Sequence, residues 1–117
     1  MTVQQKIILK NIGVNLEETL ERFSDNEDLY FNCLEKFKTS GYMDSFNKAF
    51  NEADHDPAFE AIHALKGLAG NLGFTWLYKA SSAVTEVLRT GSMEVEPDLI
   101  MELDDEYERV IANVNKL

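Results

Sequence analysis

The chain has 117 residues, of which 44% are hydrophobic and 27% charged, and its formal net charge is −10 because 21 Asp and Glu oppose 11 Lys and Arg. These proportions are typical of one globular domain, residues 1–117, with a single core. The negative charge argues against nucleic acids and anionic membranes as partners, since both require a positive surface. No apolar run reaches the length of a membrane span and the first residues lack the features of a signal peptide, so we expect a cytoplasmic protein.

The N-terminal part of the chain contains one clear helical pattern and one ambiguous segment. Residues 2–11 mix apolar and polar side chains in a way that fits both a short helix and an extended arm. From residue 16 to residue 23, apolar side chains recur at helical spacing, and Asn15 stands at the position of an N-cap. We therefore predict a short helix over residues 16–23 and leave the conformation of residues 2–11 open.

The next helical pattern is interrupted once. It begins near Glu27 and is broken at residues 39–41 before the apolar spacing resumes at Met43. The break is compatible with one long helix that bends at Gly41 and with two helices that meet there. The part before the break carries Cys33, the only cysteine, which we expect to be a small core residue rather than a reactive thiol.

Residues 51–56 form a polar connector that ends in a strong helix start. Asp56 followed by Pro57 combines an N-cap residue with proline at the first helical position. The connector also places His55 between two aspartates, but the chain offers no fourth ligand at a spacing suitable for a metal ion. We therefore expect His55 to be a solvated loop residue.

The helix predicted after this start, residues 57–72, has two different faces. Its apolar residues recur at steps of three and four and form a stripe that faces the core: Ala58, Ile62, Leu65, Ala69 and Leu72. A second arc, about 120° from the centre of that stripe, carries Phe59, His63, Lys66, Gly67 and Gly70. The imidazole of His63 is therefore predicted to point away from the core.

The two glycines on the second arc weaken the helix, since each costs about 1 kcal/mol relative to alanine in a helix interior. Because Gly67 and Gly70 lie on the side of His63, packing within the core does not explain them. We interpret them as positions that let another molecule approach the imidazole. Gly73, by contrast, follows the last apolar position and is typical of a C-terminal cap.

Two more amphipathic helices complete the chain. One spans about residues 75–90, and the last opens at residues 95–97 and carries an apolar seam to Leu117. No segment shows the period-two alternation of a strand. The predicted fold is all-α, an antiparallel up-down four-helix bundle with a short additional N-terminal helix. One apolar seam per helix is consistent with a monomer.

The motif around the histidine resembles a known signature. His63-x-Leu65-Lys66-Gly67, followed by Asn71-Leu72-Gly73, is similar to the signature of histidine-containing phosphotransfer (HPt) domains of bacterial multistep phosphorelays. The similarity extends over about residues 13–91 and includes Arg22-Phe23 in the first part of the chain. It favours one long helix, with or without a kink, across the break at Gly41. Two residues depart from the family pattern: Ala64, where a small hydroxyl residue is common, and Thr85, where an acidic residue is expected.

The resemblance implies a function for the second arc. His63 would accept a phosphoryl group from the aspartate of a receiver domain and pass it to another receiver. These would be the receiver domains of hybrid histidine kinases and response regulators. Lys66 would stabilise the charge of the phosphoryl group. Residues around the histidine would dock the partner: Phe59, Gly67, Gly70 and Asn71. The receiver would hold the Mg²⁺ ion, so no cofactor and no metal are expected on this chain.

Chemistry at His63 requires an unprotonated ring nitrogen, and about three quarters of an unperturbed imidazole is neutral at pH 7. The chain has no glycine-rich nucleotide loop, so we expect a phosphocarrier and not an enzyme with kinase activity. One alternative is a non-catalytic helical bundle that docks a receiver or a kinase without carrying phosphate. A second alternative, the dimerisation helix of a histidine kinase, is disfavoured because such helices carry an acidic residue beside the histidine, where this chain has Ala64.

Overall fold

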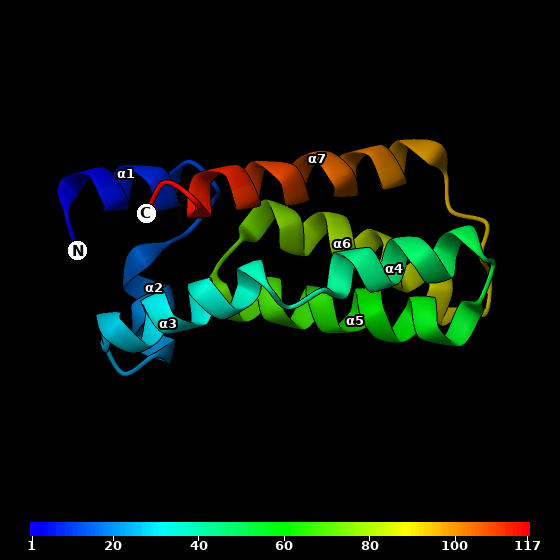
Figure 1. Cartoon of the computed structure of the whole chain (residues 1–117), viewed down its shortest axis with the longest axis horizontal. Coiled ribbons are helices and arrows are strands. Elements are labelled where there is room, and N and C mark those ends of the chain that lie inside the picture. Colours follow the sequence, from blue (N-terminus) through cyan, green and yellow to red (C-terminus); the bar gives the residue numbers. More distant parts are fainter.

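The computed structural model describes all 117 residues, which form seven helices and no strand. In chain order the helices are α1 (Val3–Lys10), α2 (Leu16–Arg22), α3 (Glu27–Lys38), α4 (Tyr42–Asn51), α5 (His55–Leu72), α6 (Thr75–Arg89) and α7 (Pro97–Val114). The bundle consists of α3 continued by α4, then α5, α6 and α7, which run up and down along the long axis of a 43 × 23 × 22 Å molecule (Figure 1). The predicted all-α bundle is confirmed.

One contiguous core runs along the bundle and includes the stripe predicted on α5. Its members on that helix are fully buried, except for Ala61, which is nearly so: Ala58, Ala61, Ile62, Leu65, Ala69 and Leu72. Aromatic rings fill the space beside them, and the rings of Phe37 and Phe74 meet edge to face at 5.1 Å. Cys33 is partly buried and packs against this core. None of the helices is both long and apolar enough to cross a membrane.

The segment before the bundle is helical throughout, apart from short turns. Residues 2–11, which the sequence left open, include α1, because Thr2 and Gln5 form a reciprocal capping box. The predicted helix after Asn15 is confirmed, and the Asn15 side chain accepts a hydrogen bond from the Glu18 amide at 3.1 Å. In Figure 1, α1 lies at the C-terminal end of α7 and contacts it there. α2 contacts α5, so this segment covers one end of the bundle.

The break near Gly41 separates two helices. Gly41 has φ 74°, a left-handed conformation, and it is the residue just before α4. A left-handed residue ends the regular hydrogen bonding of an α-helix, and glycine adopts this conformation without the steric cost of a Cβ. The single long helix that the resemblance favours is therefore wrong, and the alternative of two helices is correct. α3 and α4 nevertheless follow one another along the side of α5 (Figure 1).

The start of α5 differs from the prediction. The helix begins at His55 with Asp54 as its N-cap residue, so Asp56 is not the cap and Pro57 is the third helical residue. Proline is tolerated there because the first amides of a helix have no partner within it. His55 is not a solvated loop residue either. Its Nδ1 lies 2.8 Å from Asp56 Oδ1, and its Nε2 lies 2.6 Å from the carbonyl oxygen of Leu88 in the last turn of α6.

The end of α5 is capped as predicted. Gly73 has φ 86°, and the Phe74 amide donates to the Ala69 carbonyl at 2.9 Å. The buried hydroxyl of Tyr30 donates to the Leu72 carbonyl at 2.8 Å, and burial raises the pKa of this phenol. The side chain of Thr19 lies directly against Gly73. The C-terminal turn of α5 is therefore held by groups from both α2 and α3.

Substitution of Gly73 by alanine should destabilise the protein more than the same change at Gly91. Both residues have a left-handed backbone, but a Cβ at Gly73 would overlap the Thr19 side chain, whereas nothing lies within 4 Å of one at Gly91. We expect Gly91→Ala to cost about 1 kcal/mol from backbone strain alone, and Gly73→Ala to cost about 2–4 kcal/mol. Urea denaturation of the two variants measures the difference. Equal losses of stability in the two variants would show that the Thr19 side chain moves away from the added methyl group without cost.

The contacts of His55 predict a pH dependence of stability. Its hydrogen bond to Asp56, and then that to the Leu88 carbonyl, raise the pKa of His55 above the usual 6.5. A raised pKa in the folded state adds stability that is present below the unfolded pKa and is lost as the pH rises through the folded pKa. The free energy of unfolding of the wild type should therefore exceed that of His55→Gln more at about pH 5.5 than at about pH 8.5. If the difference in free energy of unfolding between the two proteins did not change with pH, the raised pKa of His55 would be contradicted.

Candidate functional site

His63 lies halfway along α5 and is exposed. Its ring stacks on that of Phe59, with 5.7 Å between the ring centres and 18° between the planes. Phe59 in turn stacks on His55 at 6.2 Å and 4°. These rings occupy one line of the helix, because residues four apart lie on the same face. The stack supports the imidazole of His63 on one side and leaves its other side open to solvent.

A shallow groove of about 460 Å³ lies beside the histidine. We call it the histidine groove, and its lining residues are Arg22, His63, Lys66, Gly67, Gly70, Asn71 and Tyr78. Five of the six site residues predicted from the sequence therefore line one groove. The sixth, Phe59, does not line the groove but stacks on the ring of His63, which does.

Lys66 crosses from α5 toward α6. Its side chain is 22% exposed, its ammonium nitrogen lies 5.9 Å from the centre of the Tyr78 ring, and Nζ is 3.9 Å from Oε1 of Glu86. A cation over an aromatic face at such a partly exposed site gains about 0.5–1 kcal/mol. The ammonium is therefore held between the two helices, in the groove that also contains the imidazole.

The two helix glycines of the groove have different surroundings. A Cβ at Gly67 would meet nothing within 4 Å, so this position is open to a partner. A Cβ at Gly70 would lie 3.5 Å from the Tyr78 ring, which is ordinary van der Waals contact. A Cβ would therefore fit at both positions, and packing within the protein does not explain either glycine. The interpretation that these glycines leave room for another molecule fits Gly67 better than Gly70, because no side chain lies near Gly67.

Arg22 also lines the histidine groove, although no local sequence pattern assigns it a role there. It extends from the end of α2 and donates hydrogen bonds to the carbonyl oxygens of Gly70 at 3.1 Å and Asn71 at 3.2 Å. These carbonyls belong to the last turn of α5, where the regular helical hydrogen bonds end, and that of Gly70 also accepts from the Gly73 amide at 3.3 Å. No local pattern could reveal this contact, because the partners are separated by 48 and 49 residues in the chain.

Two charged residues of α6 complete the surroundings of His63. Arg89 lies over the ring of Phe59 at 5.5 Å and forms an ion pair with Glu86 at 3.3 Å. Thr85, where the resemblance expects an acidic residue, is fully buried and donates to the Ser81 carbonyl at 2.7 Å. It is therefore out of reach of a partner. The carboxylate that approaches Lys66 comes from the next residue, Glu86.

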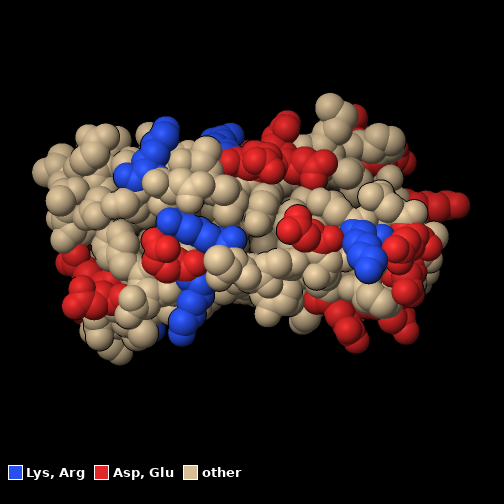
Figure 2. Space-filling view, in the orientation of Figure 1, with Lys and Arg blue, Asp and Glu red and all other residues tan.

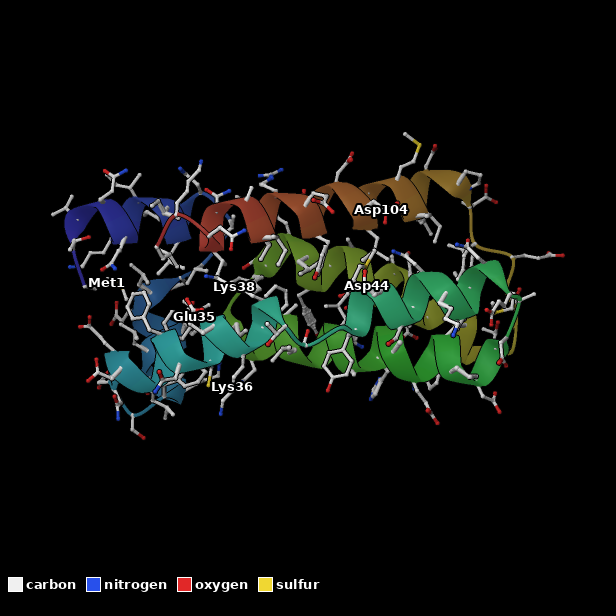
Figure 3. The ribbon with its side chains drawn as sticks, in the orientation of Figure 1. Met1, Glu35, Lys36, Lys38, Asp44 and Asp104 are labelled. Carbon is white, nitrogen blue, oxygen red and sulfur yellow. The ribbon has the colours of Figure 1, made fainter.

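A second depression, of about 560 Å³, lies on the other side of α5. Its lining residues are Lys36, Phe37, Tyr42, Ala64, Gly67, Leu68 and Asn71. Gly67 and Asn71 line both depressions and so form a low ridge between them. Figure 3 shows Lys36 on α3, projecting on the side of α5. The surface around His63 thus consists of a ridge with few side chains and a hollow on each side.

Charge is unevenly distributed over the molecule. On the face shown in Figure 2, Asp and Glu gather at the end farthest from the termini, where α4 joins α5 and α6 joins α7. His63 lies eight residues into α5, about 12 Å along the axis, which exceeds the Debye length of about 8 Å at physiological ionic strength. Three cations surround the ridge instead: Arg22, Lys36 and Lys66. The two hollows beside the ridge therefore contain three cations on an acidic protein, one of which, Lys66, lies near the carboxylate of Glu86.

The comparisons with known proteins agree with this geometry. A family model described as Hpt domain matches residues 35–113, a range that includes the whole of α4, α5 and α6 and almost all of α7. Comparison with curated proteins and with solved structures gave no match. Because the family model covers well over half of the sequence and includes the histidine helix and the groove residues on it, the chain belongs to the Hpt domain family.

Proposed function

We propose that this protein is a phosphocarrier in which His63 accepts a phosphoryl group from the aspartyl phosphate of one receiver domain and passes it to the aspartate of another. Membership of the Hpt family implies histidine phosphotransfer in a phosphorelay. The observation that carries the assignment to this residue is the exposed imidazole beside a groove that also contains Lys66. The proposed partners are receiver domains of hybrid histidine kinases and of response regulators, in the cytoplasm.

The reaction is an exchange of one bond to phosphorus for another. An unprotonated ring nitrogen of His63 attacks the phosphorus, an N–P bond forms, and the P–O bond to the receiver aspartate breaks, so that the aspartate leaves as a carboxylate. The proton on the other ring nitrogen stays in place. No side-chain hydrogen bond of the chain occupies the His63 ring, whereas both nitrogens of His55 have partners. This difference favours His63 over His55 as the nucleophile.

Lys66 is proposed to stabilise the phosphoryl group. Phosphorylation adds a charge of about −1.5 to −2 at pH 7, which the net charge of −10 would otherwise disfavour. The Lys66 ammonium lies in the same groove as the imidazole and acts as a point charge. Transfer then depends mainly on position and on charge stabilisation, because little covalent chemistry is left for the protein to perform.

The ridge and its two hollows are proposed as the docking surface. Gly67 is open to a partner, and Asn71 is exposed beside it. Tyr78 and Tyr42 flank the ridge from the two hollows and are partly exposed, 36% and 38%. Exposed tyrosines are common in protein interfaces, since they combine a large apolar ring with a polar tip. Phe59 and Gly70 are assigned to this surface as supports of His63 and Tyr78.

Substitution of His63 by glutamine should abolish phosphorylation. We expect wild-type protein incubated with phosphorylated receiver domains to take up acid-labile, base-stable label, and His63→Gln to take up none. His55→Gln is the matched control and should be labelled like the wild type, because His55 lies outside the groove. If the wild type bound a receiver but took no label from any receiver tested, the protein would instead be a docking module that carries no phosphate.

A side chain at Gly67 should slow transfer without harming the fold. Alanine there should stabilise the protein by about 1 kcal/mol, because it replaces glycine within a helix and meets no neighbour. Gly67→Leu should lower the transfer rate by about tenfold or more, equivalent to about 1.4 kcal/mol of lost contact with the partner. Ala112→Leu, on the exposed side of α7, is the control and should transfer normally. Unchanged transfer by Gly67→Leu would exclude the ridge as a docking surface.

A further inference from the structure

Glu86 is shared by two cations beside the histidine groove. Its Oε1 lies 3.9 Å from Lys66 Nζ and 3.3 Å from Arg89 Nε. The carboxylate is 61% exposed, while Lys66 is 22% and Arg89 48% exposed. Lys66 thus has a counter-ion within the protein, and this counter-ion comes from α6 rather than from the helix that carries His63.

The position of Glu86 is tied to the phosphoacceptor. Arg89 pairs with Glu86 through its guanidinium and also lies over the ring of Phe59, which stacks on His63. Contacts between successive pairs therefore lead from Lys66 to Glu86, Arg89, Phe59 and His63 across α5 and α6. Glu86 thus contacts two side chains near His63: Lys66, which lines the same groove as the imidazole, and Arg89, which lies over Phe59.

The ion pair between Lys66 and Glu86 is loose, since a separation of 3.9 Å is longer than a charge-assisted hydrogen bond. A pair of this length at a partly exposed site contributes little to stability, so it holds Lys66 only weakly. A phosphoryl group on His63 would carry close to two negative charges in the groove that Lys66 lines. Carboxylate and phosphoryl oxygens would then compete for one ammonium.

We propose that Glu86 is a positioning residue that acts through Lys66: it holds the ammonium on the α6 side of the groove when His63 is free, and it competes with the phosphoryl group when His63 is phosphorylated. This competition lowers the stability of the phosphorylated form and favours passage of the phosphoryl group to a receiver aspartate. The inference rests on the proposed function, in which His63 is the phosphoacceptor. It introduces no new reactant, because the same N–P and P–O bonds are exchanged.

The test is the equilibrium distribution of label between a receiver and this protein. Glu86→Gln should shift the distribution toward phosphorylated His63 by about two- to fivefold at low ionic strength, the range expected for loss of one exposed ion pair. The shift should largely disappear in about 1 M salt, which screens exposed charges. Glu102→Gln, an exposed α7 residue that makes no ion pair, is the matched control and should behave as the wild type. The denaturation midpoint of Glu86→Gln should stay nearly unchanged, since both ion pairs of Glu86 are long and at least partly exposed.

A double-mutant cycle identifies the route of the effect. In a Lys66→Gln background, followed to equilibrium, Glu86→Gln should no longer shift the distribution. A shift of the same size in that background would overturn the inference, because it would show direct repulsion between carboxylate and phosphoryl group. A wild-type distribution for Glu86→Gln would also overturn it and leave the proposed function intact. Failure of the wild type to take label at His63 would instead contradict the proposed function itself.

Discussion

The packing of α5 against α2, α3, α4 and α6 is the constraint on which the rest of the structure depends. Its buried stripe contains three alanines, Ala58, Ala61 and Ala69, among larger apolar residues, and small side chains allow neighbouring helices to approach closely. Once this stripe is buried, the orientation of the helix about its axis is fixed. His63 then has to face outward, because its position on the helix is set by the rotation per residue.

His63, the proposed phosphoacceptor, is thus placed on a rigid element, while its surroundings come from several others. Arg22 and Tyr30 satisfy carbonyl groups in the last turn of α5, and the left-handed Gly73 ends the helix against Thr19. At the opposite end, His55 joins the start of α5 to the end of α6. With both ends of α5 held by neighbouring helices, the groove along its second half is built on packed elements, and such preorganisation reduces the cost of binding a partner.

A phosphocarrier has to bind its phosphoryl group well enough to accept it and weakly enough to release it. The charge distribution fits this requirement. Cations surround the ridge on an otherwise acidic protein, but Lys66 is already paired with Glu86. Only interactions that are stronger in the transition state than in the phosphorylated protein accelerate transfer. An ammonium that a carboxylate of the protein also attracts therefore suits reversible transfer better than one that pairs only with the phosphoryl group.

The sequence by itself determined those features that depend on residues within about one helical turn of each other. Helical periodicity places His63 on the outward face of its helix with Lys66 and Gly67. Local hydrogen bonding accounts for the C-terminal cap at Gly73 and the N-cap at Asn15. Only the tertiary structure decided the break at Gly41, the start of α5 at His55, and the contacts of Arg22, Tyr78, Glu86 and Arg89 with the site. These contacts join α5 to α2 and α6, and the rotation and offset of one helix against another are set by packing across the whole core, which no local pattern encodes.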